Sequence, residues 1–229
     1  MACGLFGKLP SKRDFVAVNA PRRFLTAWEN WVQAGLASSR EQLGTGWQDA
    51  YLSAPIWRFW LGAEIGGAAT VGALMASVDG IGRYFPLTVF AAAPDGMIID
   101  PPTVEANDEW FASIEASMLK VLDATDPESP AEFAARLPAP AARARPETPA
   151  PPLHPAKGMA VWIAPGDGVA DVFASLGRRD IDQENAGRSY FWTIGGEDYR
   201  SQVVVCAGLP DASAFAGLLT GRFDAREDA

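Results

Sequence analysis

Charged residues are concentrated between two apolar segments at the very start of this chain, and this arrangement constrains the fold strongly. The segment 4–16 begins with apolar residues typical of a short strand and becomes apolar again at Phe15. The charged residues between are Lys8, Lys12, Arg13 and Asp14. Because a protein core does not absorb unpaired charges, we expect these residues to lie in a loop at the edge of a sheet.

A second segment, Ser77–Thr88, has the same character, with Asp79 and Arg83 between apolar residues. We expect its loop to lie on the same sheet edge as the first, so that the two form one surface. Arg83 should then donate a charge-assisted hydrogen bond to Asp14 or Asp79. The pair Arg83-Tyr84 has two interpretations: it cross-links the loops by stacking, or it belongs to a protein interface, where Arg and Tyr are enriched.

The charge balance argues against general binding to nucleic acid, because the net charge is −9 and the sequence pI is about 4.6. Lys8, Lys12 and Arg13 are most simply a solvated face. Their clustering on an acidic protein also suits an acidic or phosphorylated partner. Two cysteines, no apolar run long enough to span a bilayer and no signal-peptide pattern lead us to expect a cytoplasmic protein with reduced thiols.

Periodicity and turn residues predict the elements of an α/β (α+β) sandwich, in which helices flank a mainly antiparallel central sheet. The predicted helices are 21–36, 47–52, 107–122, 126–137, 169–176 and 212–219, and the predicted strands are 2–7, 54–61, 68–78, 87–92, 158–164, 190–194 and 202–207. The aromatic stripe of the first helix, including Trp28 and Trp31, is expected to pack in the core. The strands 68–78 and 87–92 should form an antiparallel pair with an elaborated connection.

Proline divides the chain into an N-terminal core of residues 1–137, a Pro/Ala-rich connector of residues 138–157 and a C-terminal part of residues 158–229. The connector is expected to be solvated and to bury little, with a proline-rich docking motif as the alternative. With three predicted strands, the C-terminal part should complete the same sheet rather than fold alone.

Motifs for catalysis and cofactor binding are incomplete, so we expect no cofactor and no metal site. The segment around Lys8 lacks the glycine and the Ser/Thr of a phosphate-binding loop, and Gly80-Ile81-Gly82 does not continue as a dinucleotide fingerprint. The single histidine, His154, lies within the connector. The remaining enzyme hypothesis places Asp14, Asp79, Lys8 and Arg83 around one cleft.

Several segments, taken together and in chain order, are specific enough to indicate a family. They are Gly4–Pro10 with Arg13–Phe15, Trp28–Trp31, Ala54–Phe59, Ser77–Asp79 with Gly82–Thr88, and Ser189–Thr193. In these segments the chain resembles the TagF (also called ImpM) proteins, which are associated with type VI secretion systems. The matches span nearly the whole chain, although many family members have glycine where Arg13 stands, and the connector resembles an insertion.

The resemblance implies a longin- or profilin-like fold and a non-enzymatic cytoplasmic regulator. Such a protein would repress type VI secretion after translation by acting on the forkhead-associated scaffold protein Fha. The resemblance gives no catalytic residue to carry over to this chain. The candidate partner-binding residues therefore come from the two charged loops: Lys8, Lys12, Asp14, Asp79, Arg83 and Tyr84. The alternative is a structural component of the secretion apparatus.

Overall fold

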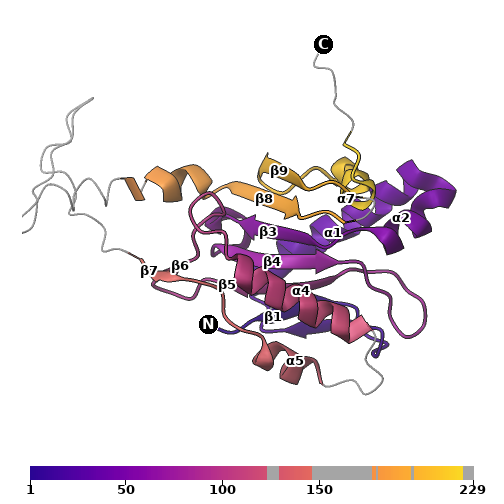
Figure 1. Ribbon diagram of the computed structural model, residues 1–229, viewed down its shortest axis with the longest axis horizontal. Coiled ribbons are helices and arrows are strands. Elements are labelled where there is room, and N and C mark those ends of the chain that lie inside the picture. The colour runs from indigo at the N-terminus through magenta and orange to yellow at the C-terminus, as the bar shows by residue number, and fades with distance from the viewer. Residues whose placement is uncertain (123–128, 146–176, 179, 197–198, 224–229) are drawn as a thin grey trace, which may run out of the picture.

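One large antiparallel sheet organises the chain, as shown in Figure 1. The computed structural model describes residues 1–122, 129–145, 177–178, 180–196 and 199–223. Within these ranges the sheet has seven strands in the order β2-β1-β5-β4-β3-β8-β9. The strands are β1 (Gly4–Gly7), β2 (Val16–Val18), β3 (Trp57–Leu61), β4 (Thr70–Met75), β5 (Leu87–Ala92), β8 (Arg188–Thr193) and β9 (Gln202–Ala207). Every neighbouring pair is antiparallel, which confirms the predicted fold class.

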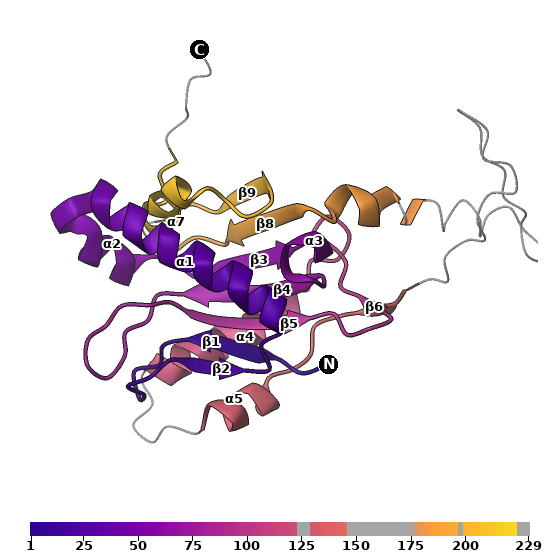
Figure 2. The ribbon, with the colours of Figure 1, turned by 180° about the vertical axis from the view of Figure 1, so that it is seen from behind.

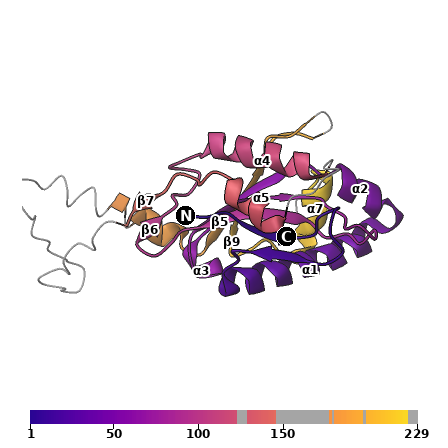
Figure 3. The ribbon, with the colours of Figure 1, turned by 90° about the horizontal axis from the view of Figure 1, so that it is seen from below.

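Helices cover both faces of the sheet, with α1 on one side and α4 on the other (Figure 3). The helical elements are α1 (Arg22–Leu43), η1 (Gly44–Gly46), α2 (Trp47–Ser53), α3 (Ala63–Gly66), α4 (Asp108–Leu122), α5 (Pro130–Arg136), η2 (Ala212–Ala214) and α7 (Phe215–Thr220). Residues 180–185 are also helical. A small second sheet pairs β6 (Met97–Ile98) with β7 (Arg143–Ala144).

The aromatic stripe of α1 packs in the core, as predicted from its spacing, where the helix crosses the strands (Figure 2). Trp28 is completely buried, and its indole Nε1 donates to the Thr88 hydroxyl on β5 over 2.9 Å. The Nε1 of Trp31 donates to the Pro210 carbonyl over 2.8 Å, which connects α1 to the C-terminal region. These donors are satisfied inside the protein, so the large rings are buried without an unpaired N–H.

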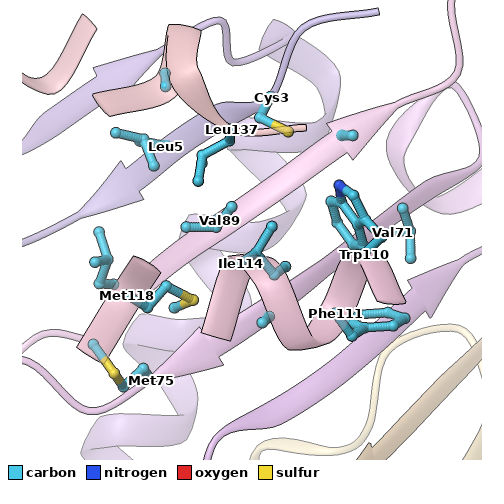
Figure 4. Close-up of a cluster of buried hydrophobic side chains, with 14 of the residues drawn as sticks. Cys3, Leu5, Val71, Met75, Val89, Trp110, Phe111, Ile114, Met118 and Leu137 are labelled. Atoms are coloured by element: carbon cyan, nitrogen blue, oxygen red, sulfur yellow. The ribbon is translucent and has the colours of Figure 1, made fainter. Parts of the chain in front are cut away.

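The opposite face of the sheet packs against the apolar side of α4 (Figure 4). Ile114 and Met118 of α4 lie over Leu5 of β1 and Val89 of β5, and all four side chains are buried. Cys3 joins the same cluster, and its thiol donates to the Pro138 carbonyl over 3.1 Å. Burial raises the pKa of Cys3 to about 11, so this thiol stays protonated at neutral pH.

A buried arginine on β3 fastens α4 to the sheet. The guanidinium of Arg58 donates Nε to Oε1 of Glu115 over 2.6 Å and Nη2 to Oε2 over 3.1 Å. The same group lies 4.9 Å from the centre of the Phe111 ring and donates Nη1 to Asp108 over 3.1 Å. The charge of Arg58 is therefore compensated on three sides, as a buried cation requires.

The first part of the expected connector packs against the body, so the expectation that this stretch buries little is wrong for residues 138–145. The Pro138 carbonyl accepts from the indole of Trp110 over 2.8 Å, and Pro140 is buried. Arg143 forms a bidentate ion pair with Asp100, with both distances at 2.7 Å. The proline-rich composition of this stretch does not predict these contacts, because the residues that it contacts, such as Trp110 and Asp100, are distant in sequence.

Other boundaries differ in detail from the expectations. The strand β2, which follows Phe15, was not anticipated. The helix predicted from residue 126 begins at Pro130, because Ser129 and Glu132 form a capping box at its N-terminus. The predicted strand 158–164, helix 169–176 and the remainder of the connector with His154 lie outside the described residues.

The C-terminal strands join the same sheet as the N-terminal ones: β8 pairs with β3, and β9 pairs with β8. Within the described ranges, no helix combines the length and the apolar character needed to span a bilayer.

Replacing Arg58 with methionine should lower the free energy of unfolding by about 3–5 kcal/mol, because it leaves the carboxylate of Glu115 partly buried without its partner. The side chains of Arg58 and Glu115 are only 6% and 14% exposed. Urea unfolding followed by tryptophan fluorescence measures the change. The matched control is Asp108→Ala, because the side chain of Asp108 is 76% exposed and its contact should contribute about 1 kcal/mol or less. Equal losses in the two variants would contradict the assignment of Arg58 and Glu115 as the main clamp.

Candidate functional site

A buried carboxylate, Asp79, lies at the centre of the region that the sequence singled out. Its Oδ2 accepts from Lys8 Nζ over 2.5 Å and from Arg83 Nε over 2.7 Å. Its Oδ1 accepts from the backbone N–H of Ile81 over 3.1 Å and from that of Arg83 over 2.9 Å. Both oxygens are therefore fully engaged, and the side chain has no solvent exposure.

Asp79 stays ionised because the hydrogen bonds that its carboxylate accepts outweigh the cost of burying the charge. Burial by itself would raise the pKa of this carboxyl, but hydrogen bonds from Lys8, from the backbone and side chain of Arg83, and from Ile81 hold it well below its usual range. The group is ionised at neutral pH and already bonded on both oxygens. It therefore acts as a structural anion rather than as a free base.

The cluster around Asp79 joins two segments, residues 8–15 and 77–85, into one unit that we call the loop platform. The backbone N–H of Gly80 donates to the Lys12 carbonyl over 3.1 Å, and Nη2 of Arg83 donates to the Arg13 carbonyl. The Ser77 hydroxyl donates to the carbonyl of Lys8 over 2.8 Å. The predicted common surface is thus confirmed, with Asp79 rather than Asp14 as the partner of Arg83.

Tyr51 of α2 forms hydrogen bonds to the loop platform, a contact that the sequence did not predict. Its hydroxyl donates to the Ser77 carbonyl over 2.9 Å and accepts from the Ser77 N–H over 3.1 Å. Burial raises the pKa of Tyr51 above its usual range, so the hydroxyl keeps its proton. The spacing of α2 places Tyr51 on an apolar face, but only the tertiary structure brings Ser77 to it.

A glycine permits the close approach of the two segments where β1 ends. Gly7 has φ of +129°, and a Cβ there would lie 2.0 Å from the Pro86 carbonyl oxygen. This position therefore needs both the backbone freedom and the small size of glycine.

The exposed side of the platform is partly apolar. Phe15 is 49% exposed and Ile81 is 58% exposed. Its ring packs edge-on against Phe85 with centroids 4.8 Å apart, and Lys8 Nζ lies 5.1 Å from its centre. Phe15 is held in place while half of it faces solvent. The sequence signal that could have indicated the exposure of Phe15 and Ile81 is that each apolar residue has charged residues close by in the sequence.

The candidate residues divide into a buried group and an exposed group. Lys8 was expected on a solvated face, but it is 3% exposed and paired with Asp79. Lys12 is half-buried and Asp14 is exposed, and neither side chain joins the ion pairs of Asp79. Tyr84 packs edge-on against Trp47 and Tyr51.

A cavity of about 600 Å³ lies beside β6, at the end of the strands that is far from the loop platform. Its lining includes Trp60, Ala69, Ala93, Met97, Arg145 and Asp182. The six candidate residues, all of which the structure describes, do not line it. Among the described residues, no group of three or more His, Cys, Asp or Glu side chains is arranged to hold a metal ion.

Asp79→Asn should destabilise the protein at neutral pH, and the loss should shrink as the pH falls. The pKa of Asp79 is lowered on folding, so its contribution is complete above the unfolded pKa of about 4 and disappears as the pH drops toward the folded value. Urea midpoints of both proteins between about pH 3 and pH 7 test this. The exposed control Asp14→Asn should change little across the range. A difference that stays constant with pH would contradict the role of the ionised carboxylate.

Lys8→Ala and Lys12→Ala should differ strongly in stability although both remove one lysine. Loss of Lys8 leaves the buried anion with one cation fewer, which we expect to cost about 3–5 kcal/mol. Loss of Lys12 removes a charge without an ion pair to the described residues and should cost about 0.5 kcal/mol or less. Thermal unfolding followed by circular dichroism distinguishes the two, and similar melting temperatures would show that Lys8 does not stabilise the cluster.

Comparison with models of protein families identifies the N-terminal part of the chain. The family model for the TagF N-terminal domain, described as type VI secretion system-associated, matches residues 4–139, a range that contains the whole loop platform. Among curated proteins, none matches the chain.

A solved structure, that of PA0076 from Pseudomonas aeruginosa PAO1, is similar over nearly its full length. The two chains share 32% sequence identity and superpose with a TM-score of 0.76, over 98% of this chain and 96% of that one. The family model covers more than half of the sequence, and the fold is shared over almost all of it. The chain therefore belongs to the TagF family of type VI secretion system-associated proteins.

Proposed function

We propose that this chain is a non-enzymatic, cytoplasmic regulator that represses type VI secretion after translation by binding the scaffold protein Fha through the loop platform. The observation that carries the proposal is the platform itself, where Phe15 and Ile81 are about half exposed on two loops fixed by a buried charge cluster. Membership of a type VI secretion-associated family supplies the biological context.

The platform has the physical properties that favour protein recognition. Large apolar side chains that stay exposed in a folded protein often mark an interaction surface when they lie together. Arg83, with a side chain 53% exposed, lies in the same loop as Ile81. Because hydrogen bonds already hold these loops in place, binding should lose little conformational entropy.

The chemistry of the cluster favours binding over catalysis. Asp79 and Lys8 neutralise each other inside the protein, and the four donors to Asp79 leave neither oxygen free to accept a substrate proton. The cavity at the other end of the strands does not contain these groups.

Ile81→Ala should weaken binding of the cognate Fha protein about tenfold, because it removes apolar contact worth about 1–2 kcal/mol at a packed interface. Isothermal titration calorimetry with purified full-length Fha measures the affinity. Overproduction of the wild-type chain should also lower type VI secretion in cells, and the variant should do so less effectively.

Leu52→Ala is the matched control, because Leu52 lies on α2 and is 53% exposed, close to the value for Ile81. Its affinity for Fha should be unchanged, and both variants should keep the wild-type melting temperature. If wild-type protein neither binds Fha nor alters secretion, the proposal fails. Co-sedimentation of the chain with assembled sheath instead of Fha would favour a structural component of the apparatus.

A further inference from the structure

Two cations on the loop platform lack the compensation that the buried charges have. Neither Lys12 nor Arg13 forms an ion pair with any residue that the structure describes. The chain carries a net charge of −9, so these two basic side chains lie on a protein that is acidic overall. Lys8, in contrast, is paired with Asp79 in the interior.

Hydrogen bonds to the 77–85 loop fix the backbone at these two residues. The Lys12 carbonyl accepts from the N–H of Gly80 over 3.1 Å, and the Arg13 carbonyl accepts from the guanidinium of Arg83. The two cationic side chains therefore start from points that are tied to the 77–85 loop. A partner's carboxylates would meet them with little reorganisation of the platform.

Apolar surface lies in the same two loops as the cations. Phe15 follows Arg13 by two residues and is 49% exposed, and Ile81 lies between the two residues that anchor its loop and is 58% exposed. A surface of this kind matches a segment that carries both carboxylates and an apolar side chain. Opposite charges at such a rim increase the association rate, whereas the apolar contact supplies lasting affinity.

We propose that the loop platform binds an acidic segment of its partner. Carboxylates of that segment contact Lys12, Arg13 and the exposed part of Arg83, and an apolar side chain packs against Phe15 and Ile81. This inference rests on the proposed function for the identity of the partner, but its recognition chemistry comes from the platform alone.

Asp14 provides a test of this proposal, because it is an exposed carboxylate in the same loop as Lys12 and Arg13. It opposes an acidic partner, so Asp14→Asn should tighten binding about threefold at low salt, whereas Lys12→Glu should weaken it about tenfold. Raising the salt concentration from about 50 mM to about 500 mM should reduce wild-type affinity and nearly remove both differences. Lys120→Glu on α4 makes the same charge change at an exposed site outside the platform and should leave affinity unchanged.

The titrations use the full chain with two probes. The first is purified Fha, and the second is a set of synthetic peptides in which one tryptophan is flanked by glutamate, by glutamine or by phosphothreonine. We expect the glutamate peptide to bind, the glutamine peptide not to bind, and Lys12→Glu to abolish the difference.

The outcomes separate the two proposals. If Fha binds but its affinity is changed neither by salt nor by the variants Lys12→Glu and Asp14→Asn, recognition of an acidic segment is ruled out. The proposed function then stands. Binding of the glutamate peptide without binding of Fha supports the recognition chemistry and overturns the proposed partner. Binding of the phosphothreonine peptide alone overturns carboxylates as the ligand, and binding of neither probe overturns both proposals.

Discussion

The buried carboxylate of Asp79 is the constraint on which the candidate site depends. An ionised group without solvent exposure is tolerated only when donors surround it, and Lys8, Arg83 and two backbone N–H groups do so here. Those donors come from Ile81 and Arg83 in the 79–83 loop and from Lys8, which directly follows β1. Satisfying one charge therefore determines the path of two loops, and the exposed positions of Phe15 and Ile81 follow from that path.

The same physical solution holds the contact between the sheet and α4. There Arg58 is the buried ion, and Glu115 and the Phe111 ring compensate it. Large aromatic residues on the other face are secured by indole hydrogen bonds such as that of Trp28 to Thr88. The platform therefore rests on a sheet whose two helical layers are each fixed by directed contacts in addition to apolar burial, and this makes it a firm base for recognition.

Much of the fold could be predicted because its signals are local. The apolar spacing of α1 was predicted with the correct start, although the helix continues to Leu43 instead of ending at residue 36. The antiparallel pair β4 and β5 was predicted with nearly correct bounds, and so were β8 and β9. The capping box at Ser129 was not recognised, so the helix was predicted to start at residue 126. The proline-rich composition of residues 138–145 gave no sign of their contacts with the body. Those contacts join groups far apart in the chain, such as Trp110 and Pro138, so no local pattern reports them.

For the candidate site, the sequence by itself determined that two charged loops lie next to apolar strands, and that Arg83 needs a carboxylate. Strand alternation and the cost of burying charge are sufficient for that conclusion. Only the tertiary structure decided that Asp79 is the carboxylate, that Lys8 is buried while Lys12 is not, and that Phe15 stays half exposed. Charge and hydrophobicity are properties of a residue, whereas burial depends on which distant segments reach it, and here that was decided when β1 and the 77–85 loop packed together.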